Sequence, residues 1–353
     1  MIGTLAVIIV FGALIFFHEL GHFCVARSFG MGVKTFSLGF GPALFSFKRG
    51  QTLYQVAAVP LGGFVALVGE SATADMPEGF THKDSFSLRP AWQRFLVIAA
   101  GPVFNLVLAW IICWGLMYAG GRNFIPPVVG EVLENSAAAQ SPLEKGDRIL
   151  SIDGVTVSRW LDIPPLVQRG QGKSLVIVVE KPDLNTVVFS IAPTQLTQTT
   201  ADGEVIESWG IGIRAGEAER QSFGFVESAR EGMFEAANMV TYTWRALTDL
   251  VTRQVAFDNV GGPILIAQAI YKQADHGLLS VLMIAALISV NLGILNLLPV
   301  PVLDGGHLIF LMTEMLVGKP VPARVQEKAM LVGLFLLLGL MVAATFNDVM
   351  RFF

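Results

Sequence analysis

The sequence predicts a polytopic α-helical membrane protein with four transmembrane helices, a membrane-associated β-hairpin region and one inserted β-rich domain. Of its 353 residues, 53% are hydrophobic and only 15% are charged, whereas about a quarter of a soluble protein is charged. Four apolar segments approach the ~20 residues that cross a ~30 Å hydrocarbon core. They are residues 2–27, 95–118, 278–302 and 329–346. The formal net charge of −4 gives no reason to expect nucleic acid as a partner.

Basic residues predict the orientation of these segments. The connection between the first two segments is rich in Lys and Arg, and the connection between the last two contains Lys319 and Arg324. Short connections with such residues lie on the cytoplasmic side of a membrane. The long section 119–277 and both termini then lie outside, which is the periplasm in a Gram-negative source. We therefore expect a multi-pass protein of the bacterial inner (plasma) membrane.

The first apolar segment contains His18-Glu19-Leu20-Gly21-His22, an H-E-x-x-H motif. Residues i and i+4 lie on one face of a helix, so the two imidazoles can bind one Zn²⁺ ion. Glu19 lies beside them and can take a proton from metal-bound water. The alternative is a polar patch where a helix meets water, but ionisable groups inside apolar sequence are usually functional. The motif and the lack of a basic leader indicate a retained span, not a cleaved signal peptide.

A catalytic zinc site needs a third protein ligand and an open position for water. Asp304 is the candidate, because it is a carboxylate at the end of a span that Pro299 and Pro301 interrupt. His307 is an alternative ligand. The first and third spans run in the same direction, so both motifs fall toward the cytoplasmic end. Asn296 could donate to a developing oxyanion, hold the scissile backbone, or serve only in packing.

Two stretches near these motifs leave alternatives open. Residues 32–70 alternate apolar and small residues in runs broken by Gly and Pro, which predicts hairpin strands. Our hypothesis is that this hairpin folds against the membrane and offers a strand edge to an extended peptide. The alternative is an ordinary surface hairpin. In the second span, Pro102 should loosen the helix and Asn105 needs a partner, so both serve either packing or the site.

The predicted β-rich domain covers residues 119–196. Its β-branched runs 149–152, 175–180 and 186–191 are separated by turn signals, and a helix is predicted at 163–168. The stretch S-P-L-E-K-G-D-R-I-L-S-I-D-G-V resembles the PDZ pattern. This resemblance implies a domain that adds a peptide strand to its sheet edge, although a steric filter that binds no peptide is an equal alternative.

The segment 197–277 is predicted to link this domain to the membrane. It begins with a hairpin around Asp202 and Gly203. Within residues 223–255, apolar side chains follow helical spacing with charges between them, which predicts an amphipathic helix on the membrane surface. The membrane parts of the chain are then residues 1–118 and 278–353.

Several motifs together resemble the site-2 protease family of intramembrane zinc metalloproteases, in particular its regulator of sigma-E protease branch. They are H-E-L-G-H, A-G-P-V-F-N, the single PDZ-like insert, G-G-P-I and N-L-L-P-V-P-V-L-D-G-G-H, which together cover nearly the whole chain. The resemblance implies that His18, His22 and Asp304 bind zinc. It implies that Glu19 is the general base and that Asn296 contacts the substrate or the oxyanion.

The resemblance also implies the substrates. They would be single-pass membrane proteins, such as an anti-sigma factor already trimmed by another protease, or signal-peptide remnants. The best-known enterobacterial members have two tandem PDZ domains, whereas one is found here, so their substrate screening cannot be carried over. We expect the PDZ-like domain in the periplasm and the active site in the membrane near its cytoplasmic side, in contact with lipid.

Two other classes of protein are alternatives to a zinc metalloendopeptidase. A membrane-tethered PDZ scaffold with a structural metal would want a fourth protein ligand. A metal transporter would place ionisable residues in more spans than are found here.

Overall fold

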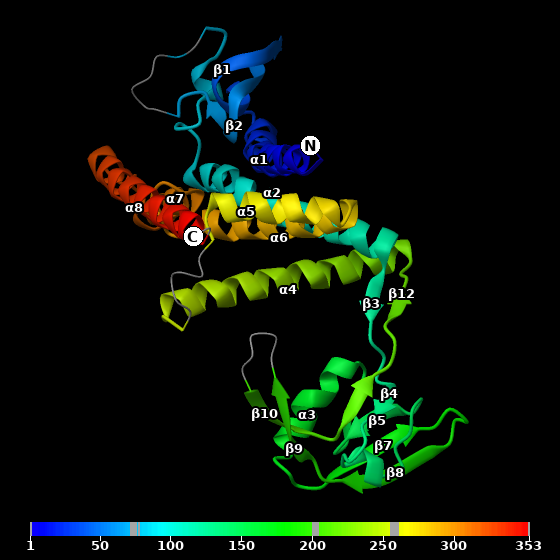
Figure 1. The fold of residues 1–353 in the computed structure, drawn as a ribbon. Helices are drawn as coiled ribbons and strands as arrows, with labels where there is room; N and C mark the ends of the chain where they lie inside the picture. The colour runs from blue at the N-terminus through cyan, green and yellow to red at the C-terminus, as the bar shows by residue number, and fades with distance from the viewer. Residues whose placement is uncertain (1, 71–75, 77, 200–204, 255–260, 352–353) are drawn as a thin grey trace. The chain divides into compact units, whose positions relative to one another are not determined.

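The computed structural model describes residues 2–70, 76, 78–199, 205–254 and 261–351 (Figure 1). The chain separates into two compact units, which we describe individually. One consists of residues 1–120 and 224–353, and the other of residues 121–223. The predicted domain boundaries at 118, 196 and 277 stay a prediction.

Four helices of the first unit are long and apolar enough to cross a membrane, as predicted. They are α1 (Ile2–Ser28), α2 (Ala91–Gly120), α6 (Leu278–Asn296) and α8 (Ala323–Met350). The prediction that the third helix reaches residue 302 was wrong, because Pro299 and Pro301 cannot continue the backbone hydrogen bonding of a helix. By contrast, α2 continues through Pro102.

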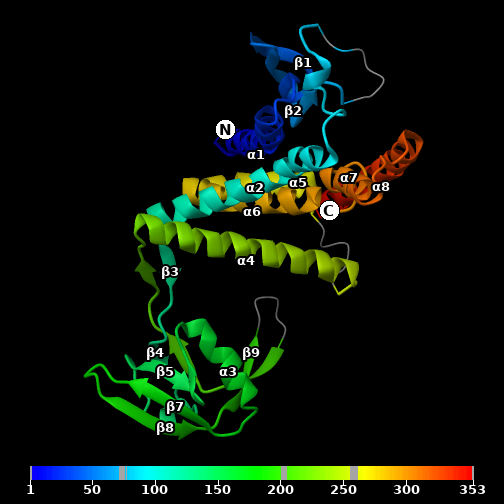
Figure 2. The ribbon, with the colours of Figure 1, turned by 180° about the vertical axis from the view of Figure 1, so that it is seen from behind.

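Three more helices pack around these four. They are α4 (Phe225–Val251), α5 (Pro263–Asp275) and α7 (Asp304–Val317). The amphipathic helix predicted within 223–255 is therefore confirmed as α4. Figures 1 and 2 show α4 running along α2 and α6. The indole N–H of Trp110 on α2 donates to the carbonyl oxygen of Ala229 on α4 at 3.0 Å.

A buried carboxylate joins the last apolar helix to the start of α5. Asp348, near the end of α8, is only 2% exposed. Its Oδ1 accepts a hydrogen bond from the N–H of Gly262 at 2.8 Å, and its Oδ2 accepts from Ile264 and Leu265 at 3.0 Å each. The first N–H groups of a helix have no partner inside the helix and carry partial positive charge. Asp348 therefore caps α5 from another helix.

The hairpin predicted between the first two spans is present as β1 (Val33–Arg49) and β2 (Thr52–Leu67). Both strands bend, so their halves pair separately. Ser37 in the first half of β1 pairs with Phe64 on one side and with Gln55 on the other. The end of β2 is consequently an edge of this ladder among the described residues, and its outer backbone has no strand partner there.

The second unit contains a four-stranded antiparallel sheet of order β6-β5-β7-β8 and the short helix α3 (Ile163–Arg169). The sheet strands are β5 (Arg148–Ile152), β6 (Val155–Thr156), β7 (Leu175–Glu180) and β8 (Thr186–Ile191). The three predicted strands and the predicted helix are therefore confirmed.

Three two-stranded pairs complete this unit. They join β3 (Arg122–Phe124) to β12 (Glu219–Gln221), β4 (Val129–Val132) to β11 (Ile213–Ala215), and β9 (Thr194–Thr199) to β10 (Val205–Gly210). The predicted turn at Asp202 and Gly203 lies between β9 and β10, outside the described residues.

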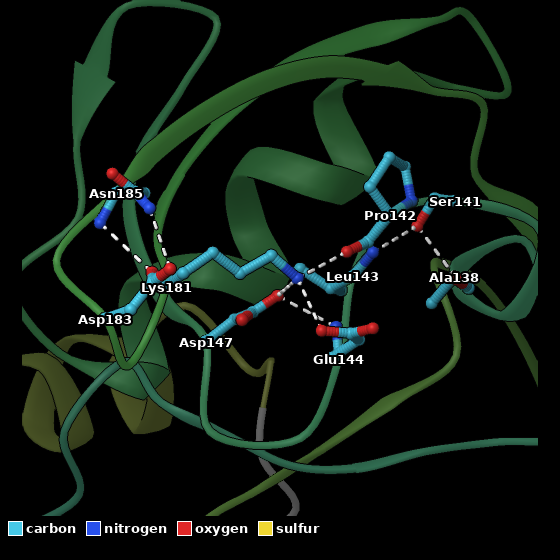
Figure 3. A network of polar contacts seen from close by, with 9 residues as sticks. All are labelled: Ala138, Ser141, Pro142, Leu143, Glu144, Asp147, Lys181, Asp183 and Asn185. Carbon is cyan, nitrogen blue, oxygen red and sulfur yellow. Dashed lines mark hydrogen bonds and ion pairs between the residues drawn. The ribbon is translucent and has the colours of Figure 1, made fainter.

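A polar network fixes the Gly-Asp turn that precedes β5 (Figure 3). Gly146 has a φ of +95°, which favours glycine. Asp147 is fully buried and accepts a hydrogen bond from the N–H of Glu144 at 2.8 Å. Lys181 binds Asp147 at 3.0 Å and Glu144 at 2.9 Å, and it donates to the carbonyl oxygen of Pro142 at 2.7 Å. A buried carboxylate is tolerated here because it is paired.

Candidate metal centre

The structure brings together the two histidines of the H-E-x-x-H motif and Asp304 from α7. Nε2 of His18 lies 3.3 Å from Nε2 of His22 and 3.2 Å from Oδ2 of Asp304. Nε2 of His22 lies 3.8 Å from the same oxygen. Among the described residues, these three form a group of potential metal-ligand side chains whose donor atoms all lie within 4.8 Å of one another.

Hydrogen bonds from α2 hold both imidazole rings. Nδ1 of His22 donates to the carbonyl oxygen of Val97 at 2.8 Å, which leaves the Nε2 lone pair directed at the cluster. The amide of Asn105 lies 3.2 Å from Nδ1 of His18, and its Oδ1 is buried without a partner. Turning this amide by 180° lets Oδ1 accept from Nδ1–H, which gives His18 the same tautomer as His22. Asn105 therefore contacts the site, one of the two alternatives that the sequence left open.

α1 and α2 cross closely at the histidine pair. A Cβ atom on Gly101 would lie 2.6 Å from Cε1 of His22 and 2.8 Å from Cε1 of His18. A Cβ atom on Gly21 would lie 2.7 Å from the carbonyl carbon of Ala100. Only glycine fits at both positions, and sequence reasoning missed the role of Gly101 in the A-G-P-V-F-N motif.

The hairpin reaches Glu19 through the end of β2. A Cβ atom on Gly63 would lie 2.9 Å from Cγ of Glu19, and the backbone of Val65 hydrogen-bonds to the Glu19 carboxylate. The end of β2 therefore holds the Glu19 side chain by packing and by a hydrogen bond. We refer to residues 63–67 of β2 as the edge segment.

Asp304 is the first residue of α7, and a tight turn holds this helix start. Its side chain is 18% exposed. A Cβ atom on Gly305 would lie 2.6 Å from the carbonyl carbon of Leu297, and one on Gly306 would lie 2.8 Å from the backbone nitrogen of Pro301. The two glycines thus let α7 begin against the segment that follows α6, which fixes the depth of the carboxylate.

A cavity of about 640 Å³ opens in front of the cluster. Its walls include His18, Glu19, Arg94, Asp304, His307 and Glu314. Arg94 forms an ion pair with Glu314 across the cavity wall, which ties α2 to α7. Burial lowers the pKa of His307, although the negative charge of Asp304 opposes this effect.

The two remaining candidates from the sequence, His307 and Asn296, lie outside this group of three donor residues. His307 lines the cavity but is not part of the group of three close donor atoms. Asn296 is the last residue of α6, and it is not among the residues that line the cavity. Its predicted contact with substrate stays a prediction.

The three donor atoms fit a zinc ion. With ligand distances of about 2.0–2.2 Å, the ligands of a tetrahedral zinc lie about 3.3–3.6 Å apart. The three separations here are 3.2, 3.3 and 3.8 Å. Oδ2 of Asp304 is buried and accepts no hydrogen bond, and such an atom is costly unless it binds a cation. Two imidazoles and one carboxylate also leave a fourth position open, as in catalytic zinc sites.

Comparison with known proteins identifies the family. Residues 6–340 match peptidase family M50. The chain belongs to this family. It is 38% identical, over 97% of its length and 94% of the relative, to a protein of Agrobacterium fabrum whose name also describes a zinc metalloprotease. It is also 30% identical to the zinc metalloprotease RasP of Bacillus licheniformis and to the regulator of sigma-W protease RasP of Bacillus subtilis. Each of these matches covers 99% of this chain and 99% of the relative.

The family resemblance that the motifs predicted is thus confirmed, and this M50 member is a zinc metalloprotease. Among solved structures, a PDZ domain of an SdrC-like protein from Listeria monocytogenes is 22% identical, with a TM-score of 0.21. That match covers 27% of this chain and 88% of the domain, and it is too weak to assign the fold of the second unit.

We expect Gly101→Ala to weaken zinc binding by about 10–100-fold, the range seen when groups supporting a ligand are disturbed. The added methyl group would overlap both imidazole rings and displace them from their present positions. Competition with a chelator of known affinity measures the change. Gly115→Ala, on the same helix with nothing within 4 Å of its Cβ, is the control and should bind zinc as the wild type does. Equal zinc affinity for both variants would contradict this packing account.

Proposed function

We propose that this protein cleaves peptide bonds within the membrane-spanning segments of single-pass membrane proteins. The observation that carries this proposal is the position of the donor cluster. His18 and His22 lie on α1, far along a helix that is long and apolar enough to span, about 20 Å from Leu5 at ~1.5 Å per residue. Asp304 follows α6, another such helix, after a connecting segment of residues 297–303. A protease with its ligands at this depth acts on bonds that ordinary proteases cannot reach.

The cavity supports an active site that opens toward the cytoplasm. Glu70 and Ser87 of its wall belong to the connection between the first two apolar helices, and Pro320 belongs to the connection between the last two. Basic residues predict that both connections are cytoplasmic. The carboxylate of Glu70 and the hydroxyl of Ser87 give water a polar route to the cluster. The same orientation puts the unit 121–223 in the periplasm of an inner-membrane protein.

The chemistry we propose is hydrolysis with Glu19 as general base. His18, His22 and Asp304 would hold the zinc, which would supply a Lewis acid that lowers the pKa of water toward ~7 and polarises a carbonyl group. Glu19 takes a proton from the attacking water as a new C–O bond forms. The π electrons of the scissile carbonyl move onto its oxygen. Glu19 then gives the proton to the amide nitrogen as the C–N bond breaks, so the carboxylate ends as it began.

The edge segment is the surface we propose for the substrate backbone. A helical peptide bond is shielded by its own hydrogen bonds, so the substrate must unwind before it is cleaved. Gly63, Phe64 and Val65 line the cavity, and the outer backbone of this segment has no strand partner in the described chain. An unwound peptide can pair with it as an added strand, which holds the scissile bond beside Glu19.

The substrates we propose are anti-sigma factors and signal-peptide remnants. The name of the Bacillus subtilis relative, which refers to sigma-W regulation, supports the first class. The unit 121–223 either binds a peptide of the substrate or excludes bulky ectodomains. Membrane lipid is the partner we propose for the outer face of α4, where Val226, Trp244 and Val251 share one side of the helix and are 80%, 60% and 82% exposed.

Cleavage of a single-span test substrate by detergent-purified protein tests the proposed function. We expect a zinc chelator to abolish cleavage and added zinc to restore it. Glu19→Gln should retain zinc in elemental analysis yet lose at least ~10²-fold in turnover, because it cannot accept the proton. Mass spectrometry of the products should place the cut inside the span. A cut confined to the soluble flanks, or normal turnover by Glu19→Gln, would overturn the proposal.

We expect Val65→Pro, introduced into the Glu19→Gln variant, to weaken binding of the single-span substrate while zinc content stays unchanged. Proline removes an N–H group from the edge segment and prevents strand pairing at that point. The Glu19→Gln background separates this loss from any effect on hydrolysis through the contact between the Val65 backbone and Glu19. Leu44→Pro in the same background is the control, because Leu44 is 73% exposed and has no partner in the β1–β2 register. Equal substrate binding by the two double variants would mean that the substrate does not pair with the edge segment.

A further inference from the structure

Hydrolysis at the metal centre needs a donor for the oxygen that becomes negatively charged. Such donors account for a large part of an enzyme's rate enhancement, because they stabilise charge that appears only in the transition state. Glu19 and Asp304 can accept hydrogen bonds but, when ionised, cannot donate them. A donor that acts beside the metal can come from another side chain in the cavity wall.

Several donor side chains of the wall already make hydrogen bonds within the fold. Arg94 pairs with Glu314 and donates to the carbonyl oxygen of Arg89 at 3.0 Å. Gln326 donates to the carbonyl oxygen of Val321 at 2.8 Å.

The hydroxyl groups and the other imidazoles of the wall are engaged as well. The hydroxyl of Ser87 lies 3.2 Å from that of Ser85. The rings of His18 and His22 belong to the donor cluster and to its supporting hydrogen bonds. Each of these side chains thus has a polar partner within the fold or belongs to the donor cluster.

His307 differs from these side chains. Its ring makes an edge-to-face contact with Phe310, at 6.4 Å between centroids, but no ring nitrogen of His307 hydrogen-bonds to any part of the described chain. A neutral imidazole still has one N–H group to donate. The wall thus contains one half-buried imidazole whose donor is unused by the fold.

The geometry of α7 directs this imidazole to the reacting centre. Asp304 and His307 are three residues apart on one helix, so they share a face and lie about 4.5 Å apart along its axis. Both line the same cavity as Glu19. The close packing of Gly305 against Leu297 fixes the start of the helix, and with it the position of the ring relative to the ligands.

We propose that His307 donates a hydrogen bond to the scissile carbonyl oxygen as that oxygen becomes negatively charged. His307 neither binds the metal nor transfers a proton in this step. This proposal rests on the proposed hydrolytic function. It gives His307 the role of oxyanion donor, which the sequence suggested for Asn296, a residue outside the cavity wall.

Four variants of the full-length protein test this assignment. His307→Phe keeps the ring without a donor, and His307→Gln restores an N–H donor of similar reach. Asn296→Leu tests the competing donor, and Glu19→Gln tests hydrolysis itself. For each variant we would measure zinc content, thermal unfolding, kcat and KM. We would also measure direct binding of a peptide phosphinate, which resembles the tetrahedral state, and of a peptide hydroxamate, which binds the metal without that resemblance.

We expect His307→Phe to retain zinc, unfolding temperature, KM and hydroxamate binding. Its kcat and its phosphinate affinity should fall together by about 10²–10³-fold, the loss seen for one oxyanion donor. His307→Gln should recover part of both. Asn296→Leu should change phosphinate and hydroxamate affinity by equal factors.

Other outcomes would overturn the assignment. Loss of zinc in His307→Phe would make His307 a ligand, and an equal fall in unfolding temperature and kcat for both His307 variants would make it a packing residue. Unchanged kcat in His307→Phe, or a loss of phosphinate affinity without loss of hydroxamate affinity in Asn296→Leu, would also refute it. Failure of the hydrolytic function is a separate result, because Glu19→Gln would then retain full turnover.

Discussion

The membrane part of this structure depends on how three polar atoms among apolar helices are satisfied. These atoms are two imidazole nitrogens and one carboxylate oxygen, and they lie within 3.8 Å of one another. Polar atoms removed from water cost several kcal/mol unless each has a partner. Val97 and Asn105 bind the outer nitrogens of the two rings. A zinc ion held by His18, His22 and Asp304 would satisfy the inner atoms and would then contribute to the stability of this arrangement.

The helix α2 is the scaffold of the centre, although it contributes none of the proposed ligands. It supplies the carbonyl group that orients His22, the amide beside His18 and the glycine that admits both rings. It also holds α7 through the ion pair between Arg94 and Glu314. The second apolar helix therefore sets the relative position of the first helix and of the start of α7.

The main features could be predicted from the sequence where the signal was local. Helical spacing placed His18 and His22 on one face, and hydropathy gave the four long helices. The pairing of Asp304 with them followed from topology. By contrast, α5 and α7 are too short to be recognised as membrane spans from hydropathy. The bent pairing of β1 and β2 depends on contacts across the hairpin. The buried cap by Asp348 and the clearance at Gly101 likewise arise only when distant segments meet.

The zinc K-edge X-ray absorption spectrum of the purified protein tests the central claim most directly. The account predicts one zinc per chain, with two imidazole nitrogens and one carboxylate oxygen at about 2.0–2.2 Å and one further light atom. The outer-shell signal of the imidazoles should be lost in variants of His18 or His22. A protein that binds no zinc, or a spectrum with sulfur ligands or without imidazole, would contradict it.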